Sequence, residues 1–399
     1  MRLFNLLVFF LCASISIYAQ QDWCTPDRAE LTDLNNLHTI KPRMVLTIPV
    51  VFHIVWHDSI DNISDERIQS QIDVLNTDYR KLNSDLAFVP DLFKHLSADM
   101  EIEFCLASVD PNGQSSSGIT RLYTDIKDIG TLNTPSIPSK AFIKHSNLGG
   151  VDSWDYERYL NIWVGKFQDN SGYLGQSSFP WYVDKSEDGI RIDPKYVGIN
   201  CINTTKKKYS YGRTLTHEIG HYLGLYHPWE NKCSAAGDQV DDTPTQSSYY
   251  TGCPGLIYDY GCLTVPITMN FMQYSDDKCM AMFTEGQKTR VWDMLQNYRP
   301  ALLTQTINCN FLSKDTILSE SHIKIYPNPV NTCLTVELSI ENQLEVQLEL
   351  WDITGKLIYN EKMPSIAIRP LEIGYLPKGI YLLKINSGNQ SITRKIIVI

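Results

Sequence analysis

Three histidines occur at a spacing that suits the binding of one metal ion. The segment TLTHEIGHYLGLYH carries His217 and His221 four residues apart, so in a helix both imidazoles project from the same face. Gly224 suits the sharp turn that ends such a helix, and His227, three residues later, can return as a third ligand. Zinc held by three protein side chains keeps its fourth tetrahedral position open for water. The spacing therefore predicts a catalytic zinc site.

Glu218 is the candidate catalytic residue of this segment. It follows His217 directly without being a ligand, and it can accept a proton from a water molecule whose acidity the metal has raised. The fixed residues of the pattern, the three histidines with Glu218 and Gly224, come together by chance on the order of once in a hundred thousand. The remaining histidines lack ligand spacing and are expected in the core or at the surface: His38, His53, His57, His95, His145 and His322.

The elements expected around this segment indicate an α/β domain. The apolar, β-branched run LTIPVVFHIVW over residues 46–56 predicts a buried strand. Shorter runs near residues 100–109 and 159–167 also have the composition of strands. A helix capped by Ser64 is expected after the first strand, because apolar residues recur there at spacings of three and four. The members of this apolar stripe are Ile68, Ile72, Leu75, Tyr79 and Leu82.

The composition is that of a globular protein of more than one domain. The chain has 399 residues, of which 43% are hydrophobic and 20% charged. Its net charge of -10 argues against nucleic acids and anionic membranes as partners.

The first residues predict export from the cytoplasm. Arg2 precedes an apolar run that ends in a small-residue cleavage site, so residues 1–19 are expected to be a signal peptide. No later stretch reaches the roughly 18 apolar residues of a membrane-spanning helix, so we expect a secreted or cell-surface protein. Residues 20–43 are polar and end in a basic pair, Lys41 and Arg43, which suits a cleavable pro-segment.

An exported chain can form disulfides, and its cysteines are clustered. Cys233, Cys253, Cys262 and Cys279 lie close together in the sequence, which indicates local cross-links. A structural zinc site made of these four thiols is the alternative, although no Cys-x-x-Cys pair is present. Spacing alone leaves open the pairing of the other cysteines: Cys105, Cys201, Cys309 and Cys333.

Longer motifs extend the histidine pattern. EIEFCLASVDPNGQSSSGITR, GRTLTHEIGHYLGLYHPW, GDQVDDTP and NFMQYSDDKCMAMFTEGQ lie within residues 46–299, and with them the chain resembles the bacterial branch of the pappalysins, a family of metzincin zinc metallopeptidases. The resemblance implies a metzincin-like α/β catalytic domain, with a twisted sheet and an active-site helix, that hydrolyses internal peptide bonds. Gln273 stands where the family more often has Asp, and Tyr222 where it often has Trp, but neither position takes part in the mechanism.

The resemblance also implies roles for residues beyond the histidine motif. Met272 would form the Met-turn, an apolar base beneath the metal, and Tyr274 would hydrogen-bond the tetrahedral intermediate. A thioether adapts to an irregular cavity, and a phenol can stabilise a developing oxyanion. The family pattern further implies two disulfides, Cys233 to Cys262 and Cys253 to Cys279.

Calcium is the second metal that the resemblance implies. Hard cations of this kind take six to eight oxygen ligands, which an acidic loop can supply. A loop that is only solvated is the alternative. The candidate ligands are Asp238, Asp241, Asp242 and Thr243.

Two further expectations concern specificity and latency. By the resemblance, Asp277 lies at the bottom of the pocket for the side chain that follows the cleaved bond, so cleavage before Arg, and less strongly Lys, is expected. The alternative is that Asp277 solvates its loop or binds a cation while Asp276 points inward. Cys24, in the pro-segment, is a candidate for the fourth zinc position before cleavage, although its neighbours match the family's Cys-Gly-Thr only in part.

The chain changes character from about residue 321. Apolar residues alternate at period two, which predicts a small antiparallel β-sandwich. IYPNPV, LWDITGKLIY and LPKGIYLLKI resemble the C-terminal sorting domain of type IX secretion cargo, which implies that machinery as a partner. The chain ends in Ile-Val-Ile where a basic residue is more usual. A carbohydrate-binding or adhesive module is the alternative.

The expected organisation joins these segments into a secreted zinc endopeptidase that acts on proteins or peptides. A surface adhesin stiffened by metal is the alternative function, against which the presence of Glu218 and Tyr274 argues. The expected parts are the signal peptide (1–19), the pro-segment (20–43), the zinc metallopeptidase domain (44–304), a linker (305–320) and the β-sandwich sorting domain (321–399).

Overall fold

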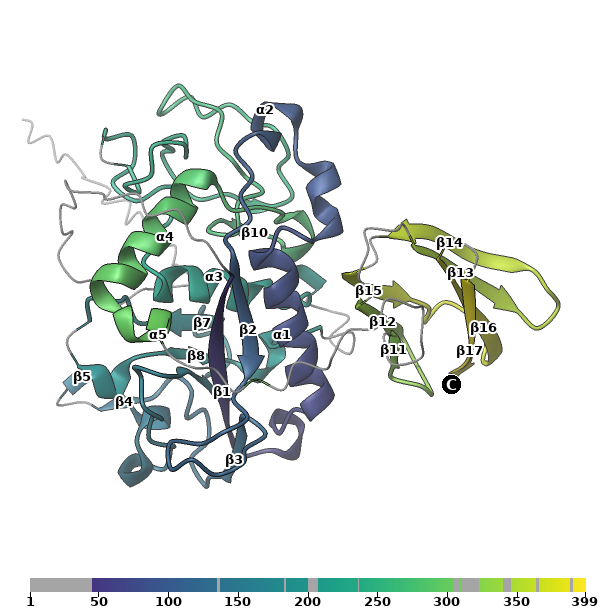
Figure 1. Cartoon of the computed structure of the whole chain (residues 1–399), viewed down its shortest axis with the longest axis horizontal. Coiled ribbons are helices and arrows are strands. Elements are labelled where there is room, and N and C mark those ends of the chain that lie inside the picture. Colours follow the sequence, from purple (N-terminus) through teal and green to yellow (C-terminus); the bar gives the residue numbers. More distant parts are fainter. Residues whose placement is uncertain are drawn as a thin grey trace, which may run out of the picture.

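The computed structural model shows two modules, each with a hydrophobic core of its own (Figure 1). The expected signal peptide and pro-segment, with Cys24, lie outside the described residues, as do Cys201 and most of the expected linker. The described residues are 45–134, 137–182, 184–199, 207–235, 237–304, 309, 323–339, 346–363, 366–387 and 390–399.

A six-stranded sheet forms the centre of the first module. The run LTIPVVFHIVW forms its longest strand, β1, with other strands paired on both sides of it. Its side chains are almost entirely buried because they pack into hydrophobic clusters on both faces of the sheet. The order is β2-β1-β6-β8-β7, with β3 also paired to β1, and only the β7–β8 pair of this sheet is antiparallel. The strands are β1 (Leu46–Trp56), β2 (Ile102–Leu106), β3 (Ile119–Tyr123), β6 (Leu160–Val164), β7 (Gly175–Ser177) and β8 (Ile190–Ile192).

Helix α1 (Asp65–Tyr79) follows β1 as the sequence predicts. Ser64 caps it, its Oγ accepting a hydrogen bond from the backbone N–H of Arg67 at 3.3 Å. The apolar stripe is buried as far as the last residue of the helix. The expectation for Leu82 is wrong: the chain leaves the helix and adopts a φ of 54° at Lys81, so Leu82 lies off the buried face and is 39% exposed.

The rest of the first module surrounds helix α3 (Arg213–Tyr222), which packs against α1, β7 and β8. The disulfides Cys233–Cys262 and Cys253–Cys279 cross-link the long segment after α3 in the pairing that the family resemblance implies, and Cys105–Cys309 joins β2 to the chain beyond α5. The remaining elements are α2 (Asp91–Lys94), α4 (Glu285–Tyr298), α5 (Pro300–Thr304), β4 (Asn133–Thr134), β5 (Ile137–Ala141), β9 (Thr251–Gly252) and β10 (Tyr274–Ser275).

The second module is the antiparallel β-sandwich expected at the C-terminus. Its strands form two sheets, in the orders β11-β12-β15 and β14-β13-β16-β17. Figure 1 shows β12 and β15 on the side that faces α1, and Arg369 Nη2 donates a hydrogen bond to Ser84 Oγ at 3.2 Å. The strands are β11 (Ile323–Tyr326), β12 (Cys333–Ser339), β13 (Val346–Asp352), β14 (Leu357–Met363), β15 (Ile366–Glu372), β16 (Gly379–Ser387) and β17 (Gln390–Val398).

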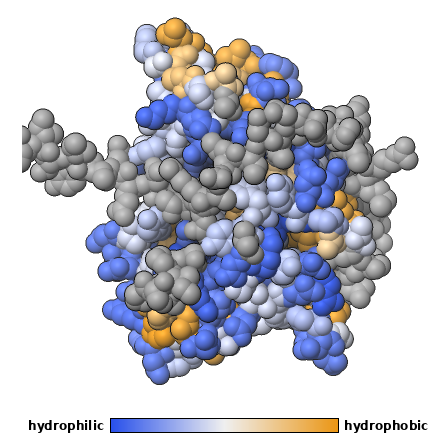
Figure 2. Space-filling model, turned by 90° about the vertical axis from the view of Figure 1, so that its left-hand side faces the viewer, coloured by the Kyte–Doolittle hydropathy of each residue, from blue (hydrophilic) through white to orange (hydrophobic). Residues whose placement is uncertain are grey.

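On the face drawn in Figure 2, hydrophilic residues cover most of the coloured area, and apolar residues are confined to small patches. Within the described ranges, none of the helices combines the length and the apolar character needed to cross a membrane.

Candidate active site

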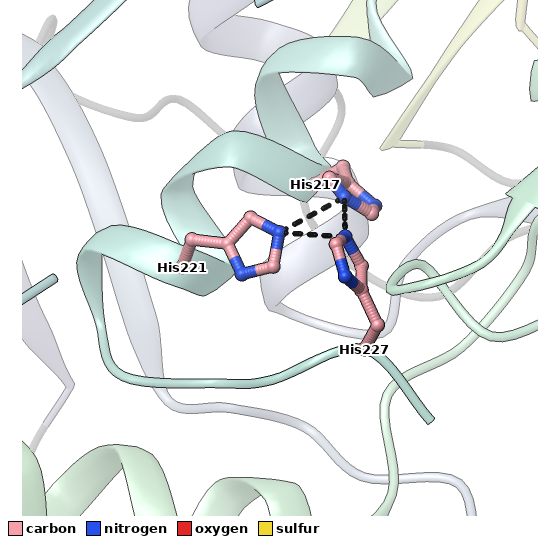
Figure 3. Close-up of side chains that lie close together, drawn as sticks. All are labelled: His217, His221 and His227. Carbon is pink, nitrogen blue, oxygen red and sulfur yellow. Dashed lines mark hydrogen bonds between the residues drawn. The ribbon is translucent and has the colours of Figure 1, made fainter. Parts of the chain in front are cut away.

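The turn after helix α3 positions the last residue of the histidine motif. The helix closes with a hydrogen bond from Leu225 N to Gly220 O at 2.9 Å. Gly224 adopts a φ of 93°, a left-handed conformation that favours glycine. The chain therefore reverses within a few residues, which returns His227 to the face of α3 that carries the other two histidines (Figure 3).

The three imidazoles converge on one point (Figure 3). The Nε2 atom of His221 lies 3.1 Å from that of His217 and 3.0 Å from that of His227, and the third separation is 3.3 Å. All three side chains are buried. In the described part of the chain, this is the single group of three or more His, Cys, Asp or Glu residues whose ligand atoms lie this close together.

Hydrogen bonds to backbone carbonyls set the tautomer of two of these rings. His217 Nδ1 donates to Phe271 O at 2.8 Å, and His221 Nδ1 donates to Leu225 O at 2.7 Å, because a carbonyl oxygen can only accept. The proton is thereby placed on Nδ1, and the Nε2 lone pair of each ring is directed at the common point.

The protonation state of these rings suits a metal. Burial lowers the pKa of His217 and of His221 well below its usual range, and each ring's neighbouring imidazole lowers it further. Both rings are therefore neutral at physiological pH, as metal ligands need to be. Three converging imidazoles, two of them neutral with fixed tautomers, fit a zinc ion with an open fourth position.

Glu218 lies on α3 next to the first histidine and is fully buried. Its side chain packs against the backbone of Gly175 in strand β7. The carboxylate is therefore held between the helix and the edge strand of the sheet.

Met272 lies beneath α3. A Cβ built on Gly220 of the helix would lie 2.3 Å from Met272 Sδ, so the thioether is in direct contact with the helix backbone. Asn270 Oδ1 accepts a hydrogen bond from Met272 N at 2.9 Å and fixes the turn. This segment also supplies the Phe271 carbonyl that orients His217. The role of Met272 as the Met-turn residue stays a prediction.

Aromatic rings surround the histidines on one side. The Tyr274 ring lies 5.8 Å from that of His217 and 5.1 Å from that of His227, measured between centroids. Trp229 stacks on His227 at 4.3 Å with an interplanar angle of 7°, and it also contacts Tyr274 at 4.6 Å. Trp229 is absent from the residues predicted from the sequence, although its place two positions after a histidine ligand could have indicated it.

Asp277 is buried at the start of α3. Its Oδ2 accepts hydrogen bonds from Tyr211 N at 2.9 Å and Arg213 N at 3.3 Å, whereas its Oδ1 has no hydrogen-bond partner among the described residues. Burial raises the pKa of Asp277 to about 7, although these N–H groups and the Arg213 guanidinium lower it. Asp277 therefore does not act as a solvated loop residue. Asp276 is also buried, and its Oδ1 likewise lacks a partner in the described part.

The residues named for calcium do not form one cluster of carboxylates. Asp238 Oδ1 accepts from Thr243 Oγ1 at 2.6 Å within the loop. Asp242 instead accepts from Thr284 Oγ1 at 2.6 Å and from Gly286 N at 2.8 Å, at the start of α4. Asp241 is exposed, so these carboxylates are directed to different places. Calcium binding stays a prediction that this arrangement does not support.

Comparison with protein families finds two matches. The peptidase M43 family, described as pregnancy-associated plasma protein-A, matches residues 146–296, which include all three histidines. The secretion system C-terminal sorting domain matches residues 324–399.

Individual relatives of this chain are also metalloproteases. An extracellular metalloprotease of Verticillium alfalfae is 45% identical over 267 residues, which cover 64% of this chain and 78% of the relative. One from Pyricularia oryzae is 29% identical over 270 residues, 64% of this chain and 76% of the relative. Among solved structures, mature mirolysin of Tannerella forsythia in complex with a cleaved peptide is 39% identical with a TM-score of 0.59, over 66% of this chain and 97% of that one.

Proposed function

The chain belongs to the pappalysin (peptidase M43) family and is a secreted zinc metalloendopeptidase, and from this premise we propose that His217, His221 and His227 bind the catalytic zinc while Glu218 acts as the general base. The observation that carries the proposal is the convergence of three Nε2 atoms within 3.3 Å of one another. The burial of all three rings and the neutral state of His217 and His221 support the same assignment.

Glu218 and Tyr274 would share the chemistry. A zinc ion bound at the histidines would polarise the scissile carbonyl and raise the acidity of the attacking water. Glu218 would take the proton of that water and pass it to the leaving amine. The Tyr274 hydroxyl would donate a hydrogen bond to the oxyanion that develops on the scissile carbonyl. Met272 would act through packing alone, as the floor under the helix.

Strand β7 is the candidate binding surface for the substrate backbone. It lies at one end of the strand order, paired to β8 on one side only among the described strands. An extended peptide can add to such an edge through main-chain hydrogen bonds. Because β7 also contacts Glu218 through Gly175, a peptide on this edge would pass close to the catalytic carboxylate.

Asp277 is the proposed determinant of cleavage before Arg or Lys. Support comes from its burial and from its Oδ1, which has no hydrogen-bond partner in the described part of the chain. A buried carboxylate oxygen of this kind gains from a cationic side chain, and the forked guanidinium of Arg fits it better than Lys. The Oδ2 atom, which is bonded to the start of α3, would hold the carboxylate in place.

Replacement of Glu218 tests the assignment of the base. The Glu218→Ala enzyme is expected to keep its zinc and to lose several orders of magnitude in kcat, because the ligands survive and the proton acceptor does not. Metal content by mass spectrometry and hydrolysis of casein with and without a chelator measure the two effects. Glu66→Ala, which removes an exposed glutamate of α1, is the matched control and should behave as wild type. Loss of zinc from Glu218→Ala, or wild-type turnover, would contradict the assignment.

Two proposals concern the flanking segments. The sorting domain would hand the protein to the type IX secretion machinery. Cys24 would keep the precursor latent by occupying the fourth zinc position. Equal activity of the wild-type and Cys24→Ala precursors would exclude that role.

A further inference from the structure

Gly175 lies on the edge strand β7, which runs beside the active-site helix α3 (Figure 1). A Cβ built on Gly175 would lie 2.9 Å from Cγ, 3.0 Å from Oε1 and 3.1 Å from Cδ of Glu218. These are its three nearest atoms, and all belong to the glutamate side chain. Glu218 is therefore what a larger residue at this position would meet first.

Backbone conformation does not explain this glycine. Its φ lies outside the left-handed region, so an alanine could adopt the same backbone without strain. Glycine weakens a strand, because it has no side chain to pack and loses more entropy on folding. The close approach of the Glu218 side chain is the remaining reason for glycine here.

The helix is packed on its other side as well. Every residue of α3 is buried, and the helix backbone at Gly220 is already in contact with Met272. An added methyl group on β7 would therefore move the Glu218 side chain rather than the helix.

We propose that Gly175 is a positioning residue for Glu218: the bare backbone of β7 leaves the space in which the catalytic carboxylate stands. This inference rests on the proposed role of Glu218 as general base. A displacement of about 1 Å at a reacting group can cost about 100-fold in rate. Contacts of 2.9 to 3.1 Å require the Glu218 side chain to shift by only a few tenths of an ångström. Gly175→Ala is accordingly expected to lower kcat by less than that factor, about 10-fold, while KM changes little.

The experiment compares Gly175→Ala with wild type in the zinc-loaded enzyme that retains its C-terminal module. It measures kcat and KM on a fluorogenic peptide, zinc content, and Tm. The control is Gly379→Ala, because that glycine also lies outside the left-handed region and a Cβ there meets nothing within 4 Å. We expect zinc content near that of wild type, lower kcat for Gly175→Ala, and no change in kcat for the control.

A second variant keeps the test decisive if Gly175→Ala is unstable. If the added methyl clashes with Glu218 alone, the double variant Gly175→Ala/Glu218→Ala recovers the Tm of Glu218→Ala. If that recovery fails, Gly175 serves another purpose and the inference is wrong. It is equally wrong if Gly175→Ala keeps wild-type kcat, or if only KM rises, since the methyl would then obstruct substrate instead.

The same set of variants separates this inference from the proposed function. If Glu218→Ala retained wild-type turnover, Glu218 would not be the general base, and the proposed function would fail whatever the result for Gly175→Ala. An inactive Glu218→Ala enzyme together with a fully active Gly175→Ala enzyme would leave the proposed function standing and overturn only the role of Gly175.

Discussion

Two neighbouring residues, Phe271 and Met272, support the histidine site from one segment of the chain. The Phe271 carbonyl fixes the proton of His217 on Nδ1, and the Met272 thioether packs under the same helix. Trp229 covers the third ring, since it stacks on His227 and contacts Tyr274. The rings of His217 and His227 are thus oriented by groups that are not themselves proposed ligands.

The charge of Asp277 should depend on pH in the working range. Burial raises its pKa to about 7, so the carboxyl is neutral below that pH and charged above it. A folded-state pKa above the ordinary value means that its contribution to stability is complete at low pH and is lost as the pH rises through about 7. A cationic substrate side chain would offset that cost, because it pairs with the charged form.

Substrate preference should follow the same titration. The ratio of kcat/KM for a peptide with Arg after the cleaved bond to that for its Leu analogue is expected to increase between about pH 6 and about pH 8. Effects of pH on the metal site cancel in this ratio, because both substrates share it. In Asp277→Asn the ratio should be small and independent of pH. A ratio that is flat with pH in the wild type, or one that survives in Asp277→Asn, would refute the proposed pocket.

At the scale of elements, Arg299, which follows the last residue of α4, connects that helix to the active-site helix α3. Its guanidinium forms a two-pronged pair with Asp188, at 2.6 and 2.8 Å, and lies 3.6 Å from the centre of the Tyr222 ring. Its Nε donates to the Tyr222 carbonyl at 3.3 Å, at the last residue of α3. Both members of the ion pair are buried.

Removal of the buried Arg299–Asp188 ion pair should lower the unfolding free energy far more than removal of an exposed pair. Arg299→Met leaves the Asp188 charge buried without its partner, which costs about 3 to 5 kcal/mol of unfolding free energy. Arg158→Met removes a pair whose side chains are 46% and 39% exposed, so about 0 to 1 kcal/mol is expected. Urea unfolding followed by fluorescence measures both. If the two variants lost similar amounts of unfolding free energy, the buried pair would contribute no more to stability than the exposed one.

At the scale of the whole molecule, the two modules have separate cores but touch at α1. The first core joins the central sheet to α1, α3 and α4, and the second fills the β-sandwich. Polar groups make this contact: Asp73 of α1 faces Glu337 and Lys324 of the sandwich, and Arg369 donates to Ser84. Catalysis and sorting are therefore expected to be separable functions.

Deletion of residues 321–399 should abolish release from the cell. The deleted segment contains the match to the sorting domain, whereas the histidine site lies in the other module. Immunoblots of culture medium and cell fractions from the bacterial host measure the distribution. Full-length Glu218→Ala is the control, and it should be released like the wild type, since it lacks only the proposed base. Undiminished release of the truncated chain would contradict the assignment of the sorting role to this module.

The spacing of residues in the sequence was sufficient to predict features that lie within a single helix or strand. The period of a helix places His217 and His221 on one face, and the alternation or continuity of apolar residues predicts β1 and the C-terminal strands, because these patterns need no information from distant segments. The end of α1 before Leu82 was missed because the reversal at Lys81 breaks the period.

Tertiary structure alone decided what the distant segments contribute. Residues more than 40 positions from the histidine motif supply the Phe271 carbonyl, the Met272 floor and the close approach of Gly175 to Glu218. Asp277 accepts a hydrogen bond at the start of α3, and Asp242 at the start of α4, and the sequence predicts neither contact. Such roles depend on which backbone donors and side chains the folded chain brings within hydrogen-bond distance, and no local period encodes those contacts.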